Sequence, residues 1–534
     1  MESDHEYAEK GDILPGFSDQ IPENLGHGTQ IAIDEPAIKL HPQPTSDALD
    51  PLNWSSFQKH IILSIVMFKY FLFTYLTTTT VPSFAEIQSQ YAISYSQVNW
   101  TVAVPALGLS VGPLIWSSLS DIYGRRTVFI FGTIIALVST IGAAVANNYS
   151  GYMAARFFQG FGVSPASTVG MAVVNDLFFD NQRGQKLGLW VLAIDAGLLL
   201  GPTFGGFLNV LSAQWINWFN AILFAVLLVL ELFFMPETLY PRQQMLLNES
   251  IAKLSEQRLK TTKETSTLQT TIPAEVRILI PPRTRKLPFL NLRPVPGMIH
   301  PKPWDSIFRF ALTFQFPVVV IAVIGYSFLW YWWVLSVITM IPSAYATYSP
   351  LIQGLLFIGL FLGTIVSEVC CSGRLSDYIV TKLSKRRNTR DAEMRLWLGY
   401  PAILLTAVGL IVWGVSLDRD YHWIVGQVAF FLFASGIQIG NTVISSYIID
   451  AYPLQSTSVV TFYAVFLNLS AFVNPFFIAS WQTSMGWTWT FTTQALIVLA
   501  GGGLLMTSLH RYGARMREMA PKPSWVNPEY DISV

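Results

Sequence analysis

Charged residues are scarce in this chain of 534 residues. Asp, Glu, Lys and Arg make up 12% of it, about half the share that is usual in soluble domains. Acidic and basic residues balance at 33 each, so the net charge is near zero. The chain therefore lacks the excess of positive charge that nucleic-acid binding requires, and its 52% of hydrophobic residues indicates lipid as its main surroundings.

Cysteines are few, and the common catalytic motifs are absent from the sequence. The two cysteines, Cys370 and Cys371, are adjacent, and neighbouring cysteines rarely bridge each other, so we expect free, buried thiols and no disulfide framework. The sequence shows no His-rich metal-ligand spacing, no nucleophile elbow and no Gly-x-x-x-x-Gly-Lys-Ser/Thr phosphate loop. These absences argue against an enzyme, against a resident metal or cofactor, and against transport driven by ATP.

What the chain has instead is twelve long apolar runs. A helix that crosses a bilayer needs about 20 mostly apolar residues, because lipid offers its backbone no hydrogen-bond partners. The predicted spans are 59–82, 98–118, 127–146, 150–175, 187–209, 215–235, 313–340, 351–372, 396–416, 422–448, 457–480 and 487–509. We therefore predict an all-α membrane protein with twelve transmembrane helices.

Polar segments divide these runs into two groups of six. Residues 1–57 form an acidic N-terminal tail without the apolar core of a signal peptide, and we predict that it is disordered and cytosolic. The spans then fall within residues 58–236 and 307–510. Residues 237–306 between them are predicted to be a cytosolic tether, with a regulatory or trafficking role as the alternative, and residues 511–534 a cytosolic tail.

A short internal repeat supports this division. Span two ends Ser117-Ser-Leu-Ser-Asp121, and span eight, its counterpart in the second half, ends Gly373-Arg-Leu-Ser-Asp377. A match at equivalent positions of two halves is typical of duplicated bundles. We therefore predict two pseudo-symmetric six-helix bundles, with Asp121 and Asp377 in equivalent cytosolic gate loops.

The basic residues predict the orientation in the membrane. With a cytosolic N-terminus, the inner loops outside the central segment and the C-terminal tail hold Arg125, Arg126, Arg183, Lys186, Arg374, Lys382, Lys385, Arg386, Arg387, Arg390, Arg395, Arg511, Arg515, Arg517 and Lys522. The outer loops hold Arg419 alone. Because cytosolic loops carry an excess of Lys and Arg, we place both termini in the cytosol. The plasma membrane is the default location, and the vacuolar membrane is the alternative.

Three patterns carry a resemblance to a known family. The turn after span two reads Ser117-Ser-Leu-Ser-Asp121-Ile-Tyr-Gly124-Arg125-Arg126, span four holds Arg156-Phe-Phe-Gln159-Gly160-Phe-Gly162, and span five holds Gly197-Leu-Leu-Leu-Gly201-Pro202-Thr-Phe-Gly205-Gly206. Over residues 50–510 the chain resembles the major facilitator superfamily, and within it the twelve-span drug:proton antiporters of fungi. The resemblance implies a monomeric secondary transporter in which two bundles rock about a shared cavity.

The turn after span two is suited to close the cytosolic side. Gly124 permits backbone angles that other residues avoid, and the charges of Asp121, Arg125 and Arg126 can pair with Asp176 at the cytosolic end of span four. We interpret these residues as a gate. Ordinary positive-inside topology is the alternative.

Span five carries a glycine motif. Gly197, Gly201 and Gly205 recur every four residues and so share one helix face, where small residues allow close backbone approach. Pro202 removes a backbone donor and permits a kink. We interpret the motif as tight helix packing that also serves the rocking of the bundles.

Ionisable residues inside the spans usually face a cavity or a partner, because charge in lipid is costly. Arg156 in span four is assigned to proton coupling by the resemblance, with a structural hydrogen-bond hub as the alternative. Asp195 in span five is the candidate proton carrier, because burial and a nearby cation change a carboxylate's proton affinity in opposite directions. A static salt bridge to Lys69 or Arg156 is its alternative.

Further polar and aromatic residues fill out a predicted substrate cavity. Lys69 in span one would attract an anionic substrate or compensate Asp195. Glu231 and Glu368, near the cytosolic ends of their spans, are expected to reach the membrane interface. We assign to the cavity Lys69, Gln159, Tyr326, Trp330, Gln438, Asn441, Asn468 and Asn474.

The sequence thus predicts a proton-coupled secondary transporter that exports a small organic compound, such as a drug, toxin or secondary metabolite. Its partners would be that compound, protons and the lipid bilayer. The first alternative is an uptake symporter for a sugar, an organic acid or a polyamine. The second is a transporter-like nutrient sensor.

Overall fold

The computed structural model describes residues 42–242, 245, 246, 249, 292–295, 300–372, 374–387 and 391–521. Among these residues, twelve helical segments are long and apolar enough to cross a membrane. They are Ser56–Tyr91, Tyr95–Tyr123, Arg125–Val145, Tyr149–Leu177, Gly188–Asn209, Ala213–Phe234, Pro317–Ala344, Pro350–Cys371, Ala392–Asp418, Trp423–Ala451, Ser456–Phe476 and Ile478–Met519. Each overlaps the predicted run at the same place in the order, so the prediction of twelve spans is confirmed.

The first half consists of α1 (Ser56–Thr78), α2 (Phe84–Tyr91), α3 (Tyr95–Tyr123), α4 (Arg125–Val145), α5 (Tyr149–Val163), α6 (Pro165–Leu177), α7 (Asp180–Asn209) and α8 (Ala213–Phe234). Proline and polar caps set several of these boundaries. Ser94 and Gln97 form a capping box at the start of α3, which satisfies backbone N–H groups that have no partner inside the helix. Pro165 opens α6, so span four consists of two consecutive helices.

The second half consists of α10 (Asp305–Thr313), α11 (Pro317–Tyr326), α12 (Trp333–Ala344), α13 (Pro350–Leu355), α14 (Ile358–Ser367), α15 (Arg374–Arg387), α16 (Gly399–Asp418), α17 (Trp423–Ala451), α18 (Ser456–Val473), α19 (Ile478–Ile497) and α20 (Gly503–Met519). Short turns interrupt its spans. The π-helical turns η4 (Ser327–Tyr331) and η5 (Glu368–Ser372) lie in spans seven and eight. Such turns shift the direction of the side chains that follow and are frequent at functional sites.

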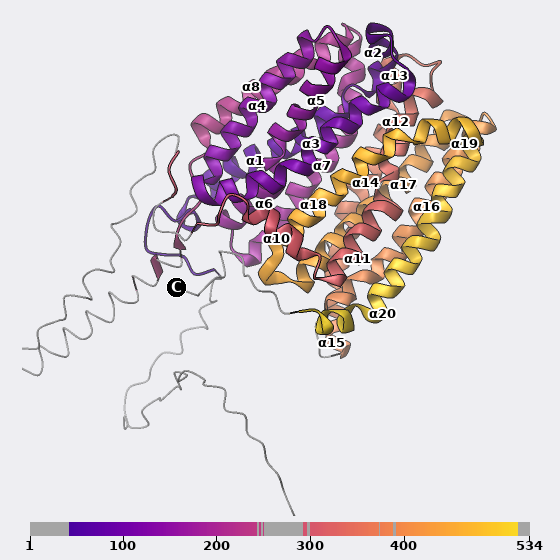
Figure 1. Ribbon diagram of the computed structural model, residues 1–534. Helices are drawn as coiled ribbons and strands as arrows, with labels where there is room; N and C mark the ends of the chain where they lie inside the picture. Colours follow the sequence, from indigo (N-terminus) through magenta and orange to yellow (C-terminus); the bar gives the residue numbers. More distant parts are fainter. Residues whose placement is uncertain are drawn as a thin grey trace, which may run out of the picture. The chain divides into compact units, whose positions relative to one another are not determined.

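The two halves repeat one packing pattern. In the first, α4 packs on α5 and α8, and α3 packs on α5. In the second, α16 packs on α17 and α19, and α14 packs on α17. The halves meet along two seams, α3 against α18 and α7 against α13 and α14, and Figure 1 shows them side by side. The chain therefore forms two pseudo-symmetric six-helix bundles, as predicted.

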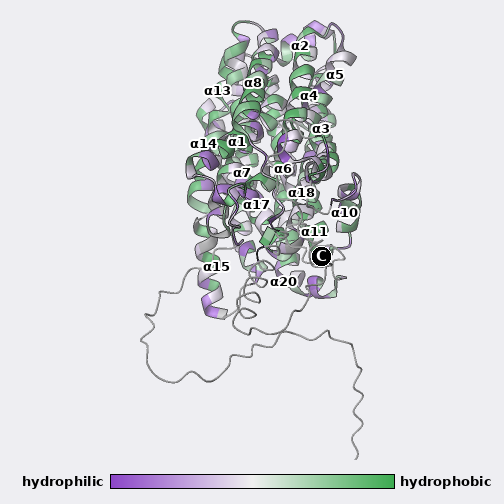
Figure 2. Cartoon of the chain, turned by 90° about the vertical axis from the view of Figure 1, so that its left-hand side faces the viewer, coloured by the Kyte–Doolittle hydropathy of each residue, from purple (hydrophilic) through white to green (hydrophobic). Residues whose placement is uncertain are grey.

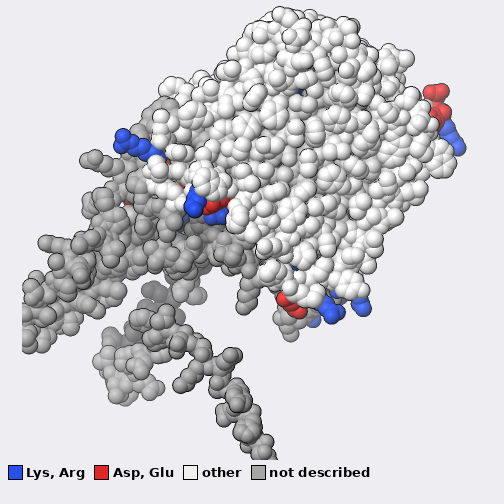
Figure 3. Space-filling model, viewed as in Figure 1, with Lys and Arg blue, Asp and Glu red and all other residues white. Residues whose placement is uncertain are grey.

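Charge and hydropathy follow the expected bilayer geometry. With twelve spans, the start of α1 and the end of α20 lie on one side, which we call the terminal side; the other is the distal side. Hydrophobic residues dominate the helices in Figure 2, whereas α15 at the terminal side is more hydrophilic. In Figure 3 the broad face over the spans is nearly free of charged residues, which gather at its margins.

Three segments differ from the sequence expectation. Most of the tail predicted over residues 1–57 lies outside the described residues, but its last part is folded: Asp50 pairs with Arg242 at 3.0 Å, and Tyr240 donates a hydrogen bond to Asp47. A separate helix, α10, precedes span seven. The last helix, α20, continues to Met519, beyond the predicted end of the second bundle at residue 510.

The glycine motif of α7 packs on two partners. A Cβ added at Gly201 would lie 2.3 Å from Thr78 Oγ1, and one added at Gly205 would lie 1.9 Å from the carbonyl oxygen of Thr79, so this face touches the end of α1. The next residue, Gly206, faces the other bundle, where an added Cβ would lie 2.7 Å from the carbonyl oxygen of Pro350. The motif therefore allows α7 to pack closely on α1 in its own bundle and on α13 in the other bundle.

Replacing Gly205 with alanine is expected to destabilise the protein by about 1–3 kcal/mol, because the added methyl group overpacks the contact with α1. Gly503→Ala is the matched control, since no atom lies within 4 Å of its added Cβ. Thermal denaturation of both variants, purified in detergent, measures the difference. Equal melting temperatures would contradict the packing described for α7.

Candidate functional site

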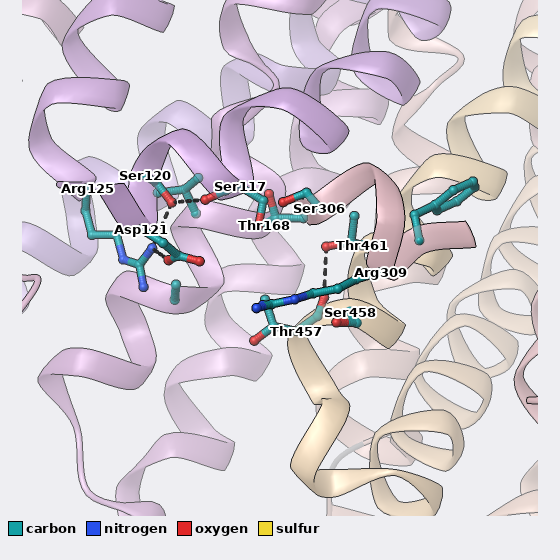
Figure 4. Close-up of a pocket in the computed structure, with 13 residues that line it drawn as sticks. Ser117, Ser120, Asp121, Arg125, Thr168, Ser306, Arg309, Thr457, Ser458 and Thr461 are labelled. Atoms are coloured by element: carbon teal, nitrogen blue, oxygen red, sulfur yellow. Dashed lines mark hydrogen bonds and ion pairs between the residues drawn. The ribbon is translucent and has the colours of Figure 1, made fainter. Parts of the chain in front are cut away.

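The bundles enclose a small cleft near the terminal side. Figure 4 shows Asp121 and Arg125 of the first bundle on one wall and Arg309, Thr457 and Thr461 of the second on the other. Its volume of about 40 Å³ holds a few water molecules, far less than the roughly 300–1,000 Å³ of a site for a drug-sized ligand. The cleft is therefore a narrow opening between closed bundles.

The predicted gate residues do lie together beside this cleft. The Arg125 guanidinium forms an ion pair with Asp121 across the turn at Gly124, and its Nε lies 3.6 Å from Asp176 Oδ2. Arg125 also donates to Ser120 Oγ at 2.7 Å. These contacts all join helices of the first bundle. Across the cleft, Ser118 and Ser306 of α10 are joined by a hydrogen bond of 2.6 Å, which ties the two bundles at the terminal side.

Glu237, which follows α8, holds the start of α4. Its carboxylate accepts hydrogen bonds from the backbone N–H groups of Arg125 at 2.8 Å and Arg126 at 3.2 Å, which offsets the positive end of the helix dipole. Burial raises the pKa of the Glu237 carboxyl, and hydrogen bonds from Leu239 and Arg125 oppose that shift. Gly124 adopts a φ of +102°, and an added Cβ would lie 2.2 Å from Glu237, so glycine is required there.

Two acidic residues of opposite bundles lie near Gln438, where α7 faces the second bundle. Asp195 of α7 is 8% exposed, and its Oδ2 atom has no hydrogen-bond partner among the residues that the structure describes. It lies within electrostatic range of Glu368 at the end of span eight and within reach of the Gln438 side chain. Gln438 Nε2 donates to Glu368 Oε2 at 2.9 Å, and Thr442, one turn along α17, donates to the same oxygen at 3.2 Å. Gln438 thus lies between two carboxylates of opposite bundles.

Aromatic side chains lie near Asp195. Tyr70, Tyr331 and Tyr463 lie within electrostatic range of its carboxylate. Tyr70 stacks on Trp190 with ring centroids 4.1 Å apart. Tyr331 lies on the π-helical turn η4, beside Tyr326. Phenol rings from α1, η4 and α18 therefore line the place where both bundles meet.

Arg156 lies at a separate place within the first bundle. Its guanidinium is fully buried and donates to the carbonyl oxygens of Leu76, Thr77 and Thr101 at 2.7–3.1 Å. Its remaining strong contact is Gln159 Oε1, one turn along α5, at 3.1 Å. Arg156 and Gln159 thus join α5 to α1 and α3, which fits the hydrogen-bond hub that was the alternative to proton coupling.

Lys69 has different surroundings from the cavity position that we expected. Its ammonium lies 3.1 Å from Glu231, and both side chains are fully buried. It also donates to the Phe129 carbonyl oxygen at 2.6 Å and to Thr133 Oγ1 at 2.8 Å. We predicted that Glu231 reaches the membrane interface. Its carboxylate is instead buried in the ion pair with Lys69. The charge of Lys69 is balanced inside the first bundle by α8, not by Asp195.

The remaining cavity residues fall into two groups. Near the acidic pair, Asn441 accepts a hydrogen bond from Tyr463, and Tyr326 donates to the Ile437 carbonyl oxygen. In the second group, Trp330 packs on Tyr326 with ring centroids 5.4 Å apart and donates to Thr406 of α16, Asn468 donates to the carbonyl oxygen of Ala464 on its own helix, and Asn474 pairs with Ser336. Asp377 lies on α15, but its side chain is outside the described residues.

Sequence reasoning missed Glu368 and Glu237 as site residues. A signal for Glu368 was available in the sequence, since spans five and eight each carry an acidic residue within an apolar run. The signal for Glu237 was the Pro236-Glu237-Thr238 sequence at the exit of span six. The tyrosines Tyr70, Tyr331 and Tyr463 carry no pattern that separates them from other aromatic residues in the spans.

Comparisons with known proteins agree with this architecture. A probable efflux pump of Aspergillus flavus is 28% identical over 451 residues, which cover 82% of this chain and 98% of that protein. An efflux pump of Trichophyton rubrum is 27% identical, covering 85% of this chain and 72% of the pump. The solved structure of the E. coli xylose transporter XylE matches with a TM-score of 0.56 at 14% identity, covering 85% of this chain and 98% of the transporter. The profile described as Major Facilitator Superfamily matches residues 66–475, more than half of the chain. The chain belongs to the Major Facilitator Superfamily.

Proposed function

We propose that this secondary transporter exports a small organic compound in exchange for protons, by alternating access between two bundles. The observation that carries the proposal is Asp195, a carboxylate buried at the contact between the bundles with one oxygen unpartnered. A group in that position can bind a proton in one state of the contact and release it when the contact opens to water. The glycine motif of α7 and two relatives named as efflux pumps support export.

The contacts between the bundles supply the moving parts of this proposal. On the distal side, Tyr95 donates to the Thr339 carbonyl oxygen at 2.9 Å, and Thr203 donates to the Gly354 carbonyl oxygen at 2.9 Å. In the middle, Ser110 donates to the Val465 carbonyl oxygen at 2.9 Å. Together with the terminal-side pair of Ser118 and Ser306, these bonds hold the bundles in a closed arrangement. The terminal side or the distal side of the contact between the bundles can open when the few hydrogen bonds on that side break.

We assign coupling to Asp195 and Arg156 with different roles. Asp195 takes up and releases the proton. Arg156 keeps α1, α3 and α5 together, so that movement at α1 reaches the rest of the first bundle. The gate around Asp121 and Arg125 closes the terminal side. We propose that this side, which carries both termini, faces the cytosol and that the protein lies in the plasma membrane.

Proton release from inside-out membrane vesicles tests this function. Vesicles from cells that overproduce the protein are acidified inside by a resident proton pump, and a panel of aromatic cations, neutral triazoles, aromatic carboxylates and hexoses is added. An exporter lets protons out when its compound enters, so we expect one panel class to collapse the gradient. Vesicles from cells lacking the protein are the control.

Two results would contradict the proposal. One is that no panel compound collapses the gradient beyond the control. The other is that a compound enters right-side-out vesicles only when protons flow inward with it, which would identify an uptake symporter. Gradient-independent binding without any flux would instead favour a nutrient sensor.

A further inference from the structure

A groove on the outer face of the second bundle lies between α14 and α17, which pack side by side (Figure 1). Its volume is about 370 Å³, which falls within the roughly 300–1,000 Å³ of sites for drug-sized ligands. The residues that line it are Ile358, Gly359, Leu362, Gln427, Val428 and Phe431. All of them except Gln427 are apolar, so the groove is suited to an apolar body.

This groove opens onto the part of the surface that lies in lipid. Ile358, Leu362 and Val428 are 39–52% exposed, although all three belong to helical segments that can cross the membrane. Gly359 forms the base, because it has no side chain, and a Cβ added there would lie 2.6 Å from Gln427 Oε1. A molecule that fills the groove therefore comes from the bilayer.

A single polar side chain reaches the groove from α17. Gln427 Oε1 accepts a hydrogen bond from the backbone N–H of Gly359 at 3.1 Å, and that N–H belongs to the first turn of α14, where the helix supplies no acceptor. This bond sets the orientation of the amide, since an N–H donor requires the oxygen opposite it. Gln427 Nε2 is a buried atom that has no hydrogen-bond partner in the described part of the chain. A buried donor without a partner indicates a missing acceptor.

The depth of this amide in the membrane restricts the kind of lipid. Tyr421 and Trp423, at the distal start of α17, are 49% and 46% exposed, as is usual for aromatic residues at a membrane interface. Gln427 lies one helical turn further in, about 6 Å along the axis. From there the groove continues past Phe431 toward the middle of the membrane. A lipid bound in it would hold one small polar group near the interface and an apolar body below.

A sterol has this distribution of groups. Its hydroxyl oxygen can accept the hydrogen bond that Gln427 Nε2 lacks, and its fused rings match an apolar groove. The close contact of α14 with α17 at Gly359 and Gly363 preforms the groove, and a rigid ligand loses little freedom in a preformed site. A phospholipid would bring a charged headgroup for which the lining residues offer no charged partner, and its flexible chains would have to be ordered.

We propose that the groove between α14 and α17 binds one membrane sterol in the distal leaflet, with the sterol hydroxyl bonded to Gln427 Nε2. The site is separate from the cleft between the bundles and from the acidic residues near Gln438. It depends neither on the direction of transport nor on protons, so it goes beyond the proposed export function.

Saturation binding of tritiated cholesterol to the purified full-length protein in detergent tests the site. Unlabelled cholesterol should displace this probe at a concentration at least about fivefold lower than cholestene, the same molecule without the hydroxyl group, because the lost hydrogen bond leaves the Gln427 donor unsatisfied. Phosphatidylcholine should not displace the probe over the same range of concentrations.

Two substitutions separate the groove from the rest of the lipid-facing surface. Gln427→Met keeps the length of the side chain and removes the donor, so probe binding should weaken at least about fivefold. Val428→Trp fills the groove with a large ring and should abolish binding. Val229→Trp is the matched control, because Val229 of α8 is 50% exposed, close to the 52% of Val428, and does not line the groove.

Three results would overturn the proposal: no saturable probe binding by the wild type, displacement by cholestene or phosphatidylcholine as effective as that by cholesterol, or wild-type binding in either folded groove variant. Size-exclusion chromatography shows which variants are folded. If Gln427→Met does not fold, the comparison of cholesterol with cholestene on the wild type still tests the hydrogen bond. The assay uses no proton gradient and no cargo, so its failure and the failure of the exporter are distinguishable.

Discussion

Replacing Lys69 with methionine is expected to destabilise the protein severely. The substitution leaves the Glu231 carboxylate fully buried without its ion pair, and removing one partner of a buried pair costs about 3–5 kcal/mol. Thr133, which donates to Glu231 Oε1 at 2.9 Å, cannot replace a charge. The yield of monodisperse protein and its thermal denaturation in detergent measure the effect.

The double variant Lys69→Met with Glu231→Leu distinguishes a structural lysine from a substrate-binding one. Replacing a buried ion pair by apolar residues of similar size is often neutral, so folding and transport should both return. Lys59→Met is the matched single control on the same helix, where the lost contact is a hydrogen bond to the Leu52 carbonyl oxygen at 2.8 Å. If the double variant folds well but transports nothing, Lys69 binds substrate and our assignment fails.

Replacing Asp195 with asparagine is expected to uncouple transport from protons. Asparagine has nearly the same shape as aspartate but cannot take up a proton. The variant can therefore still exchange cargo across the membrane, but the pH gradient no longer drives accumulation of the cargo. Proton-driven accumulation in proteoliposomes should fall at least about tenfold, equivalent to about 1.4 kcal/mol of driving force. The cargo is a compound that releases protons in the vesicle assay, supplied at saturating concentration to offset weaker binding.

The controls for this prediction come from the same chain. Asp450→Asn removes a carboxylate at the terminal end of α17, far from the contact between α7 and α14, and should accumulate cargo as the wild type does. Size-exclusion chromatography shows whether each variant is folded. Full proton-driven accumulation by a folded Asp195→Asn variant would assign the proton to another group.

Much of the fold can be predicted from the sequence, because lipid imposes a simple rule on the backbone. Twelve apolar runs had to be helices, and the repeat ending at Asp121 and Asp377 indicated two bundles. The interruptions inside the spans were harder. Neither α10 nor the π-helical turn at Ser327–Tyr331 leaves a clear signal, since both contain the same apolar and aromatic residues as the helices around them.

The site could be predicted only where contacts are local or imposed by a motif. Arg156 and Gln159 are one turn apart on one helix, and Arg125 meets Asp121 across a tight turn, so both pairs follow from spacing. Lys69 and Glu231 lie on the first and sixth spans, and their pairing depends on how each helix is rotated. Sequence patterns do not specify that rotation when a helix is apolar on most sides.

Asp195 and Glu368 show the same limit in predicting contacts between spans from the sequence. The polarity of Asp195 marked it as functional, yet its partner was assigned to the membrane interface. Glu368 opens the π-helical turn η5 and accepts hydrogen bonds from Gln438 and Thr442, and neither that turn nor these partners can be read from Glu368-Val-Cys-Cys-Ser372. Residue type thus singled out Asp195, and only the structure shows that Glu368 of the other bundle lies within its electrostatic range.

The most direct test of proton exchange at the contact between the bundles is the ratio of proton-driven accumulation to equilibrium exchange, measured for Asp195→Asn in proteoliposomes. The account predicts that exchange persists while accumulation falls to the level of protein-free liposomes. Accumulation and exchange that both remain at wild-type levels would contradict it.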